Sequence, residues 1–129
     1  KAMFEMQRKY LKAHFGVGDL YKTVFEDGFF DYAVLGEVLE HLDRPADAVK
    51  EATRILARNG ILAISTPAEE EKERGAVDGE RHIWSYDKKD IINMLEPDMC
   101  VIGTKILRSR WFPRYRYCFP QLVVWAIKK

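Results

Sequence analysis

The segment from Phe29 to Pro67 constrains the fold more than any other part of the chain. An apolar run, Tyr32 to Leu35, ends at Gly36, and a second apolar run, Ile61 to Ile64, is followed by Ser65-Thr66-Pro67. The residues between the two runs carry apolar side chains at helical spacing. Two continuous apolar strands joined by a helix form a βαβ unit, in which the parallel sheet is buried on both faces. We therefore expect an α/β fold.

Capping signals predict where the helices begin and end. In the joining helix, Asp43 is the expected N-cap, Pro45 lies in the first turn, and Asn59-Gly60 marks the end. A second helix is predicted from a cap at Ser85 through Leu95. The remaining expected elements are a helix over Met3–Phe15, a short strand over Phe15–Val17, a turn-rich connection over Tyr21–Gly28, and two strands over Met99–Leu107 and Gln121–Lys128.

Length and composition restrict the classes of protein to which the chain can belong. With 129 residues, of which 47% are hydrophobic, it is one domain, 1–129, or part of one. The formal net charge of +1 gives no general attraction to nucleic acid or to an anionic membrane. Cys100 and Cys118 lack metal-binding spacing, and we interpret them as reduced thiols of a cytoplasmic protein. No apolar run is long enough to span a membrane.

Several short motifs follow one another along the chain. Phe30-Asp31 opens the first apolar strand, Glu37 to His41 reads EVLEH, and Arg54-Ile55-Leu56 precedes Gly60 by a short interval. The second strand then ends in Ser65-Thr66-Pro67. This series resembles the fourth and fifth strands of the class I S-adenosylmethionine-dependent methyltransferases. The likeness extends back to Gly18-Asp19-Leu20 and forward to His82-Ile83-Trp84-Ser85, so it covers most of the chain.

The resemblance implies a Rossmann-like sheet with a C-terminal antiparallel edge hairpin and the strand order 3-2-1-4-5-7-6. The family's first two strands and its glycine-rich loop have no counterpart in this sequence. Gly16-Val17-Gly18 is the only G-x-G, but no apolar strand precedes it and no helix follows it. We therefore expect the carboxyl-terminal portion of a methyltransferase domain, and the initial Lys1 fits a fragment, a processed chain or further residues upstream.

The resemblance also implies a set of cofactor-binding residues for S-adenosylmethionine. Asp19 would accept a hydrogen bond from the adenine amino group, although it could equally be an ordinary turn aspartate. Leu20 would supply a backbone N–H and an apolar wall to the adenine. The residues at the end of the first strand would line the methionine side: Leu35, Gly36 and Glu37.

Two further interpretations concern the EVLEH segment. His41 could act as a catalytic base or be a hydrogen-bonded packing residue, and we favour the packing role. Glu37, Glu40, His41 and His82 also resemble the metal ligands of small-RNA 3′-end 2′-O-methyltransferases. We expect no metal site here, because similar motifs occur in family members without a metal.

Two segments have both an ordinary and a functional interpretation. The charged run Glu69–Arg74 and the glycines that follow, up to Gly79, are interpreted as a solvated loop, which could also serve as a lid over a substrate pocket. Arg108–Phe119 interleaves four arginines with five aromatic residues, a composition that can bind nucleic acid. Because the net charge is low, we favour a hairpin connection and expect no nucleic-acid partner.

The function that we expect is methyl transfer from S-adenosylmethionine to a small or medium-sized acceptor. The rival hypothesis is a non-catalytic methyltransferase-like module used for association. This hypothesis would be favoured if the gene starts near Lys1. With the first two strands absent, the strand Tyr32–Gly36 would lie at an open sheet edge. We expect this edge to be covered by a missing amino-terminal segment, by a second copy of the chain or by the helix over Met3–Phe15, and for the isolated fragment we favour self-association. The acceptor and the methylated atom do not follow from the sequence.

Overall fold

The computed structural model describes residues 13–68, 83–107 and 120–129. Its strands are β1 (Phe30–Gly36), β2 (Leu56–Pro67), β3 (Met99–Leu107) and β4 (Gln121–Lys128). Its helices are the short 3-10 helix η1 (Leu39–His41) and the α-helices α2 (Pro45–Ile55) and α3 (Lys88–Leu95). The predicted helix over Met3–Phe15, the proposed lid and the Arg108–Phe119 segment lie mostly or wholly outside the described residues.

The four strands form one sheet in the order β1-β2-β4-β3. β1 pairs with β2 in parallel, and β4 pairs antiparallel with both β2 and β3. This order confirms the predicted βαβ unit and the predicted C-terminal antiparallel hairpin, whose two strands have the expected bounds. It also matches the family order from the fourth strand onwards.

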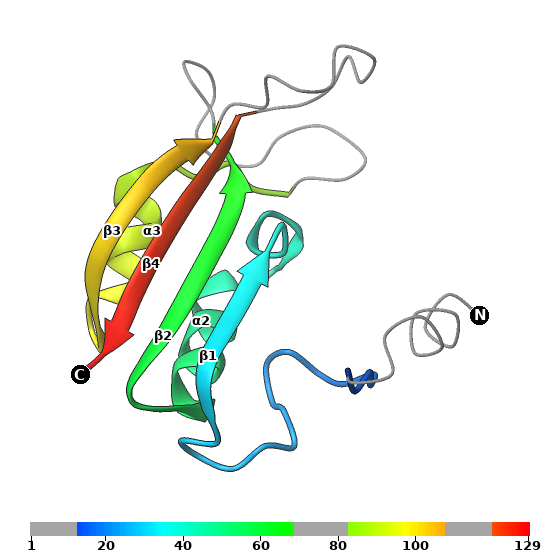
Figure 1. Ribbon diagram of the computed structural model, residues 1–129. Coiled ribbons are helices and arrows are strands. Elements are labelled where there is room, and N and C mark those ends of the chain that lie inside the picture. Colours follow the sequence, from blue (N-terminus) through cyan, green and yellow to red (C-terminus); the bar gives the residue numbers. More distant parts are fainter. Residues whose placement is uncertain (1–12, 69–82, 108–119) are drawn as a thin grey trace.

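Both α-helices cover the same face of the sheet (Figure 1). The side chains on that face form the buried core with α2 and α3: Leu35, Leu62, Ile64, Leu122, Val124 and Ala126 from the strands, and Val49, Ala52, Ile91 and Leu95 from the helices. On the other face of β1, Tyr32 and Val34 are each 73% exposed. The expectation of a sheet buried on both faces is therefore wrong for the described residues, because no described helix lies on the second face.

The joining helix is shorter than its sequence signals predicted. Its N-cap is Arg44, without a side-chain cap, so the expected cap at Asp43 is wrong; Pro45 occupies the first turn as predicted. The helix ends at Ile55, and Asn59-Gly60 instead forms a tight turn inside β2, with Asn59 at φ 64°. A Cβ on Gly60 would lie 2.8 Å from the carbonyl oxygen of Ala57, so the turn itself requires the glycine.

Two other boundaries differ from the prediction. The cap of α3 is Asp87 rather than Ser85. The Asp87 carboxylate accepts the amides of Lys89 and Asp90, and the Asp90 carboxylate accepts the Asp87 amide, which completes a capping box. Residues 15–17 form no strand, since no strand among the described residues lies beside them to complete a ladder.

In the part of the chain that is described, no helix has the length and apolar character needed to cross a membrane.

Candidate functional site

The carboxyl end of β1 lies beside the corresponding part of β2, where Gly36 pairs with Ser65. The next residue, Glu37, donates its backbone N–H to the Ser65 carbonyl at 3.0 Å, and its carboxylate accepts the Ser65 hydroxyl at 2.9 Å. Ligands of open α/β sheets bind outside the carboxyl ends of such strands. The structure thus brings a carboxylate, a hydroxyl and a glycine together at the edge where a ligand is expected.

Glu37 has an unusual backbone conformation at this point. Its φ is 54°, in the left-handed region, which costs a residue with a side chain about 1–2 kcal/mol. Its two hydrogen bonds to Ser65 hold it there. Strain of this kind is concentrated at functional sites, where the surrounding contacts maintain it.

The two residues before Glu37 have different environments. The Leu35 side chain is 6% exposed and belongs to the core under the helices, so only its backbone faces outward. Gly36 is exposed, and a Cβ there would meet nothing closer than the Ser65 hydroxyl at 3.7 Å. Packing among the described residues therefore does not require a glycine at position 36.

His41 and Glu40 lie in the η1 turn that follows. Glu40 is 1% exposed, and its carbonyl accepts the amides of Ile83 and Trp84 at 2.7 and 3.1 Å. The His41 Nε2 lies 3.8 Å from the Glu40 carboxylate. The segment between Glu37 and His41 contains only the short 3-10 helix η1, not the regular helix that would place both side chains on one face. The His41 side chain is 43% exposed, and the packing role stays a prediction.

The surroundings of Tyr86 shift the pKa of its hydroxyl. Burial, together with the negative charges of Glu40 and Asp90, raises the pKa of Tyr86 to about 12. The Tyr86 hydroxyl donates to the Leu39 carbonyl at 3.2 Å. Tyr86 thus remains protonated and ties η1 to the start of α3.

The proposed adenine-side residues form a tight turn. The Asp19 carboxylate accepts the Tyr21 amide at 2.9 Å, and the Asp19 carbonyl accepts the Lys22 amide at 3.2 Å. Leu20 is partly buried and packs against the core. Asp19 is exposed, and its second carboxylate oxygen has no partner among the described residues, which leaves it available to an amino group.

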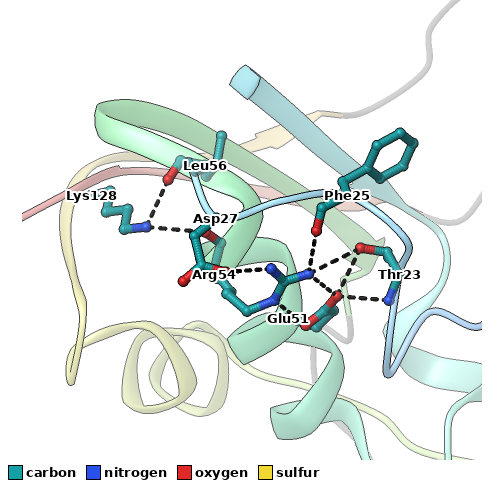
Figure 2. Close-up of polar contacts among 7 residues, drawn as sticks. All are labelled: Thr23, Phe25, Asp27, Glu51, Arg54, Leu56 and Lys128. Carbon is teal, nitrogen blue, oxygen red and sulfur yellow. Dashed lines mark hydrogen bonds and ion pairs between the residues drawn. The ribbon is translucent and has the colours of Figure 1, made fainter. Parts of the chain in front are cut away.

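A polar network fixes the connection between this turn and β1 (Figure 2). Arg54 of α2 donates to both carboxylate oxygens of Glu51 at 2.8 Å, to the Phe25 carbonyl at 2.8 Å and to Asp27. The same Glu51 carboxylate accepts the backbone N–H and the hydroxyl of Thr23, each at 2.7 Å. These bonds, led by those from Arg54, lower the pKa of Glu51 to about 2.

The sequence patterns place Arg54 and Ser65 within motifs but predict no individual role for either. They predict none for Glu51 or Thr23. The three-residue spacing of Glu51 and Arg54, which places both on one helix face, was the available signal for their pairing. Their bonds to Thr23 and Phe25 join positions almost thirty residues apart in the chain, and no local pattern indicates such a contact.

The proposed metal ligands do not converge in the described part of the chain. Glu37 is bonded to Ser65, whereas Glu40 is buried in the η1 turn. No group of three or more histidine, cysteine or acidic side chains suited to a metal occurs among the described residues, and His82 lies outside them.

Comparisons with known proteins agree with this architecture. Residues 1–64, about half of the chain, match the family model described as a methyltransferase domain. A protein of a Streptomyces fradiae transposon is 39% identical over 51 residues, which is 40% of this chain and 15% of that uncharacterised protein.

Solved structures share the fold at low identity. The [4+2]-cyclase SpnF superposes with a TM-score of 0.77 at 16% identity, over 96% of this chain and 61% of that one. A Burkholderia thailandensis 1,6-didemethyltoxoflavin-N1-methyltransferase gives 0.75 at 16%, over 98% of this chain and 56% of that one. A possible histamine N-methyltransferase of Thermotoga maritima gives 0.71 at 19%, over 100% and 70%.

The chain spans about 60% of the length of the first of these structures, so it corresponds to a part of the complete fold. The matched family model, the order of motifs and the sheet topology agree with one another. The chain belongs to the class I S-adenosylmethionine-dependent methyltransferases.

Proposed function

We propose that this chain is the carboxyl-terminal portion of a domain that transfers a methyl group from S-adenosylmethionine to a small or medium-sized acceptor. The observation that carries the proposal is the carboxyl end of β1. There, Glu37 is held at a positive φ by its bonds to Ser65, and the neighbouring Gly36 is exposed. The family match and the fold support it. We further propose a cytoplasmic location, consistent with the free thiol of Cys100.

The described residues fit one part of the cofactor. Asp19 offers a carboxylate oxygen to the adenine amino group, and the partly buried Leu20 offers an apolar contact. Gly36 and Glu37 would line the methionine side, with Leu35 contributing its backbone. The glycine-rich loop that grips ribose and methionine in the family has no counterpart in this sequence.

Little covalent catalysis is required for this reaction. The sulfonium supplies an already activated methyl group, so the protein mainly aligns the acceptor and excludes water. The absence of a nucleophilic triad from the sequence is therefore compatible with an enzyme. His41 lies beside the buried Glu40 in the η1 turn, and we propose that alignment, and not a base at His41, is what this part of the chain contributes.

Calorimetric titration with S-adenosylhomocysteine tests the proposal. We expect the full-length gene product to bind and Asp19→Ala to weaken binding about tenfold, the effect of one hydrogen bond to a charged group. Asp43→Ala, at an exposed aspartate after η1, is the matched control and should bind like the wild type.

The isolated chain should bind weakly or not at all. Low-micromolar binding by the chain alone would contradict our view that an upstream loop is needed. A full-length product that binds no cofactor would instead favour the rival function, a non-catalytic association module. The same fold serves a [4+2]-cyclase, so the fold alone does not decide between these functions.

A further inference from the structure

The connection between the Asp19 turn and β1 has no helix or strand of its own, yet contacts fix both of its ends on α2. At its start, the Tyr21 hydroxyl accepts the Arg44 amide at 3.4 Å, and the Arg44 guanidinium lies 4.4 Å from the Tyr21 ring centroid. At its end, the Gly28 amide donates to the Arg54 carbonyl at 3.1 Å. The connection therefore follows α2 from its first turn to its last.

Between these ends, side chains of α2 make hydrogen bonds to the connection, and the Phe25 ring also packs edge-on against Phe30 of β1, with ring centroids 4.8 Å apart. Glu51, which is 8% exposed, accepts the backbone N–H and the hydroxyl of Thr23. Arg54 reaches the Phe25 carbonyl and the Asp27 carboxylate while it binds both oxygens of Glu51 (Figure 2). Removing Arg54 would release Phe25 and Asp27 directly and would leave Glu51 without its cation.

The start of the connection determines where the Asp19 turn lies. Asp19 is two residues before Tyr21, which contacts the residue preceding α2. The first turn of α2 is joined through η1 to the carboxyl end of β1, so this is the end of the molecule that carries Gly36 and Glu37. A connection that slid along α2 would move Asp19 relative to that strand end.

We propose that the Glu51–Arg54 pair is a positioning element of the cofactor site: it holds the Thr23–Asp27 segment along α2 and thereby places Asp19 for the adenine. This inference rests on the proposed function. Arg54 acts through Asp19 and does not itself touch the cofactor.

The chemistry of the pair explains why arginine is needed at position 54. The planar guanidinium binds both carboxylate oxygens of Glu51 and still has donors for Phe25 and Asp27. A lysine has a single ammonium and cannot reproduce this set of bonds. We expect Arg54→Lys to restore the position of the segment only in part.

Amide hydrogen exchange of this chain tests the positioning directly. In Arg54→Met, the amides of Thr23 and Gly28 should exchange about tenfold faster. In Tyr86→Phe, which removes a buried hydrogen bond outside the network, these two amides should keep their wild-type rates. The control Arg58→Met removes an exposed arginine that forms no hydrogen bond or ion pair within the described part of the chain, and should change none of these rates. Equal acceleration of Thr23 and Gly28 in Tyr86→Phe would mean that their exchange reports only general stability and would overturn the proposal, as would unchanged rates in Arg54→Met.

A double-mutant cycle in the full-length gene product tests the link to the site. Arg54→Met should weaken the binding of S-adenosylhomocysteine about tenfold in the wild-type background. It should have little further effect on binding when Asp19 is already alanine. Additive effects of the two changes would overturn the link through Asp19. Failure of the wild-type product to bind would refute the proposed function itself, whereas the exchange experiment tests the positioning without any cofactor.

Discussion

Replacing Glu51 by glutamine should destabilise the fold in a way that depends on pH. The pKa of Glu51 is lowered from 4.5 to about 2, first by the hydrogen bonds from Arg54 and then by those from Thr23. At about 1.4 kcal/mol per pKa unit, the carboxylate contributes at most about 3 kcal/mol near neutral pH. The network lies at the surface and the Arg54 side chain is one-third exposed, so solvent screening reduces our expectation to about 1–2 kcal/mol.

The sign of the pH effect follows from the direction of the shift. Because the folded-state pKa of Glu51 is lower than the unfolded one, its contribution is fully present above 4.5 and is lost as the pH falls towards about 2. The difference in unfolding free energy between wild type and Glu51→Gln should therefore be constant near neutral pH. It should fall to about half near pH 3.

Urea unfolding followed by circular dichroism measures this difference at each pH. The control is Asp47→Asn, which removes an exposed acid of the same helix whose side chain is 52% exposed in its pair with Arg44. Such a surface pair should contribute less than about 0.5 kcal/mol. Equal destabilisation by the two variants, or a Glu51→Gln difference that does not change with pH, would refute the reasoning.

Three further outcomes are expected. Light scattering should show that the isolated chain self-associates through the open edge of β1, and Val34→Lys should reduce this association more than Ile102→Lys on β3; a clean wild-type monomer at high concentration would count against it. Elemental analysis after addition of Mg²⁺ or Mn²⁺ should find no stoichiometric metal, and bound metal that is lost in His82→Ala would instead support RNA 2′-O-methylation. Tyr86→Phe should lower the unfolding free energy by about 1 kcal/mol through loss of its bond to the Leu39 carbonyl, and an unchanged urea midpoint would contradict this.

Most of the sheet could be predicted because its signals are local. The apolar runs ending at Gly36 and Pro67 and the two final strands gave the βαβ unit and the hairpin. The errors lie where two signals compete for one position. Asn59-Gly60 is a good helix stop, but here it makes a turn inside β2, and Asp87 rather than Ser85 caps α3 because Asp90 completes its capping box.

The site was less accessible to sequence reasoning than the sheet. The strand-end residues Gly36 and Glu37 lie where the topology places them, but the positive φ of Glu37 and its bonds to Ser65 depend on the pairing of two strands. The Glu51–Arg54 network likewise joins segments that only the folded chain brings together. Contacts of this kind arise from tertiary geometry, which no local pattern of residue types encodes.

The central claim is that S-adenosylmethionine binds at the carboxyl end of β1 with its adenine at Asp19. A crystal structure of the full-length gene product with S-adenosylhomocysteine tests this most directly. We predict that the adenine amino group donates to the Asp19 carboxylate and that the homocysteine part lies over Gly36 and Glu37. A ligand bound at the opposite end of the sheet, near the Asn59-Gly60 turn, would contradict the claim.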